Sequence, residues 1–218
     1  MQRILFLGIS IYLLCGNVTA QNSSTNSSTI MDSRTDAERI EFLKQVAMTY
    51  FSDEDYESAV NAYERILEIN PKDKEARFVI SYTYIQAKQY LKAEKILLEL
   101  LEESPEDFKL MNNLAWLYAT AEDPALRNGQ RALSLAQKAM VLSPNDHQIW
   151  NTLAEAYYIT GEYEKAHRAI VHMANLAATS GKGVTKKQVE EYNEQILKCK
   201  RALDTQKALD EKKDRKEK

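Results

Sequence analysis

Four tyrosines recur at nearly equal steps through this 218-residue chain, and this internal repeat limits the possible folds more than any other feature. They are Tyr50, Tyr84, Tyr118 and Tyr157, separated by 34, 34 and 39 residues. A fixed period of this length is the signature of a repeat architecture, in which each copy packs mainly against its neighbours. The chain is therefore predicted to be a stack of similar repeats.

Other residue types recur in the same register. Four residues before each tyrosine stands an apolar residue: Val46, Ile80, Leu114 and Leu153. The next residue is small in every copy: Ala47, Ser81, Ala115 and Ala154. A second small position follows further on: Ala59, Ala93, Ala132 and Ala166. Residues four apart share one face of a helix, and small residues let two helices pack closely. Each repeat is therefore predicted to be an antiparallel pair of helices.

The ends of the repeats are marked as well. Pro71, Pro105 and Pro144 close three of them, because proline cannot comfortably continue a helix. The step from Ala93 to Ala132 is 39 residues, so the third repeat holds five extra residues between Tyr118 and Ala132. The four repeats are predicted at residues 38–72, 73–106, 107–145 and 146–179.

One segment, HQIWNTLAEAYYITGEYEKAHRAI from His147 to Ile170, shows the repeat most completely. It closely resembles the 34-residue tetratricopeptide repeat (TPR), and the resemblance covers about Glu38 to Thr179. The third repeat, with NNLAWLY followed by its insertion, looks like a variant common in exported bacterial members. The resemblance implies an all-α fold, a right-handed superhelical solenoid of about four helix-turn-helix repeats closed by a C-terminal capping helix.

The N-terminus is predicted to be a signal peptide over residues 1–20. Arg3 precedes an apolar run, Ile4–Cys15, which is shorter than the ~20 residues that span a bilayer. Small residues around Ala20 form a cleavage site, so the protein is predicted to be exported to the periplasm or the extracellular space. An uncleaved anchor is the alternative. Lipoprotein anchoring at Cys15 is disfavoured because Leu14 stands where such signals carry a small residue.

Residues 21–36 are rich in Ser, Thr and Asn and are predicted to be a disordered linker, ahead of the TPR repeats at 37–180. The linker holds glycosylation sequons at Asn22 and Asn26, and their use depends on the organism.

Residues 181–218 are predicted to form the capping helix and a charged tail. Thr185 and Gln188 form a capping box for a helix from Lys186 to about Leu209, after which the tail is expected to fray. Cys199 lies on a stripe with the apolar residues Val189, Tyr192, Ile196 and Leu203. It is therefore predicted to be a packed thiol. Once Cys15 is removed with the signal peptide, no internal disulfide can form.

Composition and motifs argue against several functions. The formal net charge of −3 does not favour nucleic-acid binding. His167 and His172 are five residues apart, which is off the spacing that places two metal ligands on one helix face. No nucleophile elbow or phosphate loop is present in the sequence. The chain is predicted to be no enzyme, to need no cofactor or metal, and to have no transmembrane segment once mature.

The family resemblance also predicts where a partner binds, because in TPR proteins the first helix of each repeat lines a concave groove. It places eleven residues there: Lys44, Met48, Phe51, Phe78, Tyr82, Ile85, Asn112, Trp116, Asn151, Glu155 and Tyr158. Aromatic rings supply contact area, and asparagine offers a donor and an acceptor to a peptide backbone. The carboxylate clamp of some members is not supported, since Met48 and Phe78 replace polar groups.

These residues predict a groove for an extended peptide or an amphipathic helix. In the alternative, the C-terminal helix folds into the groove and covers Trp116, Phe78 and Tyr82. The chain is accordingly predicted to be a protein–protein interaction scaffold or adaptor of the cell envelope. Two other functions stay open: a structural subunit that homo-oligomerises through its end repeats, and a regulatory subunit of an envelope enzyme complex.

Overall fold

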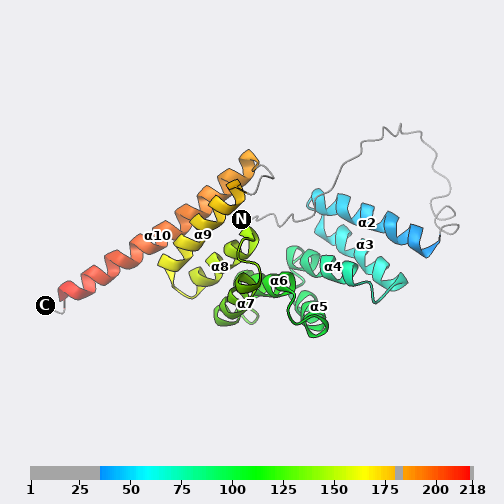
Figure 1. Cartoon of the computed structure of the whole chain (residues 1–218), viewed down its shortest axis with the longest axis horizontal. Helices are drawn as coiled ribbons and strands as arrows, with labels where there is room; N and C mark the ends of the chain where they lie inside the picture. Colours follow the sequence, from blue (N-terminus) through cyan, green and yellow to red (C-terminus); the bar gives the residue numbers. More distant parts are fainter. Residues whose placement is uncertain (1–34, 180–183, 217–218) are drawn as a thin grey trace. The chain divides into compact units, whose positions relative to one another are not determined.

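The computed structural model describes residues 35–179 and 184–216, which form nine α-helices and no strand (Figure 1). The helices are α2 Asp36–Ser52, α3 Tyr56–Ile69, α4 Lys74–Gln86, α5 Tyr90–Glu103, α6 Phe108–Thr120, α7 Gly129–Leu142, α8 His147–Ile159, α9 Tyr163–Thr179 and α10 Lys186–Lys216. This confirms the predicted all-α repeat fold. The predicted signal peptide and nearly all of the predicted linker lie outside the described residues.

The chain divides into two compact units, one ending at Asp73 and the other beginning at Lys74. In the first, Thr35 caps α2 and forms a capping box with Glu38, so the helix begins one residue before the predicted repeats. α2 packs against α3, and their shared core is formed by the buried residues Leu43, Ala47, Ala59, Val60, Tyr63 and Ile66.

The second compact unit contains three helix pairs, α4–α5, α6–α7 and α8–α9, followed by α10. The second helix of one repeat packs against the first helix of the next, as α5 does on α6 and α7 on α8. The first helices also contact one another, α4 with α6 and α6 with α8. α6 is therefore covered from several sides at once.

Burial confirms the predicted register. The four alanines of the second helices, Ala59, Ala93, Ala132 and Ala166, all have 0% exposure. Their partners on the first helices are buried as well: Ala47, Ser81, Ala115 and Ala154. The recurring tyrosines differ, since Tyr118 is 1% exposed and Tyr50 is 40% exposed. The small residues thus lie at the close contact within each helix pair.

The turns inside the repeats share one conformation. In three of them a three-residue turn has a middle residue with positive φ: Glu54 at 63°, Lys88 at 60° and Gly161 at 81°. Left-handed backbone is strained for residues other than glycine. In the third repeat the turn is longer, spanning residues 121–128, where the sequence placed its insertion. The backbone N–H of Asn128 closes this loop by donating to the Tyr118 carbonyl at 2.9 Å.

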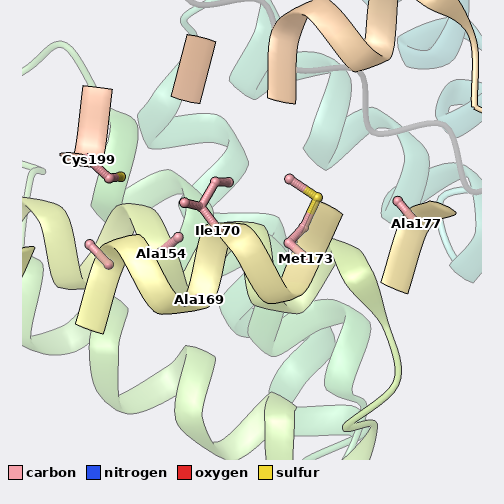
Figure 2. Close-up of a cluster of buried hydrophobic side chains, with 7 residues drawn as sticks. Ala154, Ala169, Ile170, Met173, Ala177 and Cys199 are labelled. Carbon is pink, nitrogen blue, oxygen red and sulfur yellow. The ribbon is translucent and has the colours of Figure 1, made fainter. Parts of the chain in front are cut away.

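Helix α10 runs antiparallel along α9 (Figure 1). The predicted capping box is present, since the Gln188 N–H donates to Thr185 Oγ1 at 3.2 Å and the Thr185 N–H donates to Gln188 Oε1 at 2.9 Å. Figure 2 shows Ile170 and Met173 pointing from α9 towards α10, which contributes Cys199 to the same cluster. Cys199 is 4% exposed, so the prediction of a packed thiol is confirmed.

The predicted end of this helix near Leu209 is wrong, because α10 continues to Lys216. Residues 204–216 are all exposed, so packing does not hold this part in place. Pairs four residues apart stabilise it instead, such as Gln206 with Asp210 at 2.9 Å and Glu211 with Arg215 at 3.9 Å. Basic residues in the last turn also complement the helix dipole.

Candidate functional site

The eleven residues predicted to line the groove are called here the first-helix residues, and three of them lie on α2. Lys44 is partly exposed, and its Nζ lies 4.0 Å from Asp73 Oδ2. Met48 is half-buried. The Phe51 ring meets the Tyr56 ring edge to face, with centroids 5.2 Å apart. Within the first compact unit, Lys44 and Phe51 therefore already have partners of their own.

On α4, the first-helix residues are two half-buried aromatic side chains and one buried aliphatic side chain. Phe78 and Tyr82 are half-buried and lie four residues apart, hence on one helix face. Ile85 is 5% exposed. Two rings that are neither fully covered nor fully exposed provide the kind of apolar surface that a partner's side chain can cover.

At the centre of the array, the first-helix residues are buried. Asn112 is 4% exposed and Trp116 is 7% exposed, both on α6, and Asn151 on α8 is 6% exposed. The whole stretch Leu110–Ala119 is buried, because α6 packs against α4, α5, α7 and α8. Trp116 therefore contributes to the packing of the second compact unit, which the family resemblance alone did not indicate.

The side-chain oxygen of Asn112, Oδ1, is buried without a hydrogen-bond donor in any part of the chain that the structure describes. Leaving a buried carbonyl oxygen without a donor costs about 1–3 kcal/mol. Asn151 occupies the equivalent position on α8, and α6 and α8 are in contact. The first helices thus place two side-chain amides along one row.

At the end of the array, Glu155 and Tyr158 on α8 receive a side chain from α10. The Lys198 ammonium donates to Glu155 Oε1 at 2.8 Å and to Oε2 at 3.0 Å. The same Nζ lies 3.9 Å from the centroid of the Tyr158 ring. Tyr163 meets Tyr158 edge to face, with ring centroids 5.4 Å apart, and so fixes the orientation of the ring.

Sequence reasoning missed Lys198. It immediately precedes Cys199, which belongs to the apolar stripe that was predicted to pack against the repeats. A single sequence does not show which of the residues beside that stripe face α8. In the structure, α10 packs along α9, and it meets the first-helix residues at Glu155 and Tyr158. The helix on which α10 packs is α9, whereas the alternative placed α10 over Trp116, Phe78 and Tyr82.

A second polar cluster joins the second and third repeats. Tyr118 Oη on α6 donates to Glu94 Oε1 on α5 at 2.6 Å, and the Arg131 guanidinium on α7 lies 4.4 Å from the Tyr118 ring centroid. Burial, and then the hydrogen bond to Glu94, raises the pKa of Tyr118 well above its ordinary value. The phenol therefore stays protonated and serves as a donor, which makes this cluster a structural tie between three helices.

Two further findings concern metal sites and membrane-spanning helices. Within residues 35–179 and 184–216, no three His, Cys, Asp or Glu side chains come together in a way that could hold a metal ion. Over the same part of the chain, no helix combines the length and the apolar character needed to cross a membrane.

Comparison with known proteins places this chain in a family. Two sequence models described as tetratricopeptide repeat match residues 50–124 and residues 135–168, which together make up half of the chain. The protein belongs to the tetratricopeptide repeat family, whose members generally serve as protein–protein interaction scaffolds and not as enzymes.

Individual relatives are distant. Superkiller protein 3 of Schizosaccharomyces pombe is 27% identical over 123 residues, which cover 55% of this chain and 9% of that protein. The chain therefore spans less than a tenth of this relative. A thermophilic TPR protein of Thermus thermophilus aligns with a TM-score of 0.55 at 20% identity, covering 76% of this chain and 90% of that one. MamA of Desulfovibrio magneticus aligns with a TM-score of 0.53 at 20% identity, covering 66% and 78%.

One similar structure comes from an enzyme. The O-GlcNAc transferase of Thermobaculum terrenum aligns with a TM-score of 0.52 at 20% identity, over 66% of this chain and 27% of that chain. At such identities the three structural likenesses establish the repeat fold alone.

Proposed function

We propose that this protein is an exported adaptor of the cell envelope, which holds a peptide or a helix of a partner protein along the first-helix residues of its second compact unit. The observation that supports this most is the half-buried aromatic surface of Phe78 and Tyr82 on α4 and of Tyr158 on α8. A ligand can cover the part of these rings that the chain leaves exposed. Asn112 and Asn151 are buried in the free chain and belong to the packing beneath this surface.

Aromatic side chains are enriched among residues that dominate binding energy. Export rests on the predicted signal peptide, and catalysis has no part in the proposal.

A second candidate function is self-association, favoured by exposed apolar residues on α5. Leu91 is 70% exposed and Leu98 is 36% exposed, and they lie seven residues apart on one helix face. The residues that occupy these two positions in the first and third repeats are polar: Glu57, Gln130, Glu64 and Gln137. Exposed leucine at positions that are polar in the first and third repeats is consistent with a contact between copies of the chain.

Site-specific photo-crosslinking separates the two functions. One chain carries p-benzoyl-phenylalanine in place of Tyr82 on α4, and a matched chain carries it in place of Leu91 on α5. After irradiation in envelope extract, the adaptor function predicts that a partner of distinct mass attaches at position 82 and not at position 91. Products with the mass of two copies, formed at position 91 in the purified protein, would support self-association. Attachment of partners at position 91 alone would contradict the adaptor proposal.

A further inference from the structure

The contact between Lys198 and α8 has the features of an occupied binding site. Both oxygens of the Glu155 carboxylate accept from one ammonium, at 2.8 and 3.0 Å. The Glu155 side chain is 15% exposed and that of Lys198 is 28% exposed, so the pair is largely removed from water. A charge-assisted pair that is shielded from solvent is stronger than the same pair on an open surface.

An aromatic ring forms the other wall of this site. Tyr158, one turn after Glu155 on the same helix, places its ring centroid 3.9 Å from the Lys198 Nζ. A cation over the face of an aromatic ring is attracted by the ring quadrupole. The carboxylate and the ring therefore hold the same ammonium from two directions, and the edge contact of Tyr163 keeps the ring in place.

The position of this site in the repeat is informative. Glu155 is the one acidic side chain among the eleven first-helix residues, and it stands where the second and third repeats carry Tyr82 and Trp116. The fourth repeat thus replaces a ring by a carboxylate at a position that the family resemblance assigns to ligand contact. The side chain that meets the carboxylate comes from α10, which begins after the last repeat has ended.

We propose that Glu155 and Tyr158 form a recognition site for an alkylammonium group, the end of a lysine side chain. Lys198 fills the site in the free chain, and a lysine of the bound partner takes its place in the complex. This last step rests on the proposed adaptor function, whereas the existence of the site does not. A compact ammonium fits the site because one nitrogen reaches both carboxylate oxygens and the ring.

The apolar contacts of α10 allow the site to be emptied without removing the helix. Cys199 packs against the cluster that contains Ile170 and Met173, and Tyr192 and Ile196 add to it. Replacing Lys198 by alanine removes the ammonium but leaves this cluster intact. Alanine also keeps the helix propensity high.

The test is chemical rescue in the full-length chain. In Lys198→Ala, hydrogen exchange of the α10 amides should quicken by about tenfold, and ethylammonium chloride should slow it again in a saturable, millimolar range. Sodium chloride at equal ionic strength is the salt control. Lys200→Ala, which removes an exposed lysine of the same helix, is the matched variant and should leave exchange unchanged. Adding Glu155→Gln to Lys198→Ala should abolish the rescue.

Two outcomes would overturn the site: exchange that Lys198→Ala does not alter, or a rescue by ethylammonium no greater than that by sodium. If Lys198→Ala unfolds α10 completely, the unaltered chain still provides a test. The side-chain ammonium of Lys198 should then give a slowly exchanging nuclear magnetic resonance signal that Glu155→Gln abolishes, and a signal that persists in Glu155→Gln would refute the site.

Displacement by a partner has its own readout. Partner attachment to p-benzoyl-phenylalanine at position 82 should increase several-fold when Lys198→Ala is added, because the internal competitor is gone. Attachment that stays unchanged would overturn the displacement step, even if ethylammonium rescue shows that the site exists. Absence of any attached partner, with rescue intact, would count against the adaptor function and leave the alkylammonium site standing.

Discussion

Helices α6 and α10 of the second compact unit differ in how much of their surface the chain covers. Ten consecutive residues of α6, Leu110–Ala119, are buried, whereas Cys199 is the one buried residue in the 31 residues of α10. α6 touches its own repeat partner and helices of both neighbouring repeats, while α10 packs on α9. In a repeat array, an interior helix therefore contributes most to stability, and a terminal helix is the part that can be displaced.

Replacing Trp116 by alanine should have the largest effect on stability. The ring is 7% exposed at the centre of α6, and losing a buried aromatic side chain typically costs ~3–5 kcal/mol. Leu209→Ala on α10 is the matched control, because Leu209 is 56% exposed and its loss should change stability by less than ~0.5 kcal/mol. Chemical denaturation measures both variants. Equal losses of stability in the two variants would contradict the view that α6 contributes more to stability than α10.

Ala166→Leu tests the contact between the helices of the last repeat. Ala166 is 0% exposed within the α8–α9–α10 cluster, and overpacking such a contact costs about 1–3 kcal/mol. Ala178→Leu, at an exposed position of α9, introduces the same side chain outside the core. Thermal melting of Ala166→Leu should fall clearly below that of Ala178→Leu. Matching melting curves would show that the assigned register is wrong.

Part of the fold and of the site followed directly from the sequence. The positions of Ala59, Ala93, Ala132 and Ala166 were predictable because packing inside a helix pair repeats with the period of the sequence. The place of the insertion in the third repeat, between Tyr118 and Ala132, followed from the number of residues between the recurring positions. Both depend on contacts between residues close in the chain, where a periodic pattern carries the information.

Contacts between distant residues were not predictable in the same way. The burial of Trp116 depends on helices contributed by neighbouring repeats, so its position in the repeat does not reveal it. Lys198 and Glu155 are 43 residues apart, and their pairing depends on how α10 is rotated against α9. The helix beyond Leu209 was missed because the absence of apolar residues was read as fraying, although pairs such as Glu211 and Arg215 support it.

Alkaline pH should weaken the packing of α10, and this effect on stability should be smaller than that of replacing Trp116 or Ala166. Burial raises the pKa of the Cys199 thiol from 9.0 to about 11, with opposing contributions from the charges of Lys198 and Glu155. The folded chain therefore keeps the thiol protonated where the unfolded chain ionises it. Its contribution to stability is complete below pH 9 and is lost as the pH rises from 9 through about 11.

Thiolate absorbance at 240 nm, taken as the difference between the unaltered chain and Cys199→Ala, should rise near pH 11 in the folded protein. Burial also raises the pKa of Tyr192, and Cys199→Ala removes the thiol while leaving that phenol in place. A thiol that titrates near pH 9 in the folded chain would mean that α10 does not cover it.

Ala208→Pro should have the smallest effect on the core. Proline in a helix interior costs roughly 3 kcal/mol, so the exposed end of α10 should lose helix, seen as a reduced circular dichroism signal. Residues 204–216 make no buried contacts, so the melting temperature of the second compact unit should not change. A lower melting temperature would show that this end of α10 stabilises the repeats.

Hydrogen exchange of the unaltered full-length chain, followed residue by residue, tests the difference in burial between α6 and α10 most directly. Amides of Leu110–Ala119 should exchange only through unfolding of the whole second compact unit and so be among the slowest in the chain. Amides of residues 204–216 should exchange fastest among the helices, and those around Cys199 should lie between. Equal protection of α6 and the exposed end of α10, or faster exchange in α6, would contradict the account.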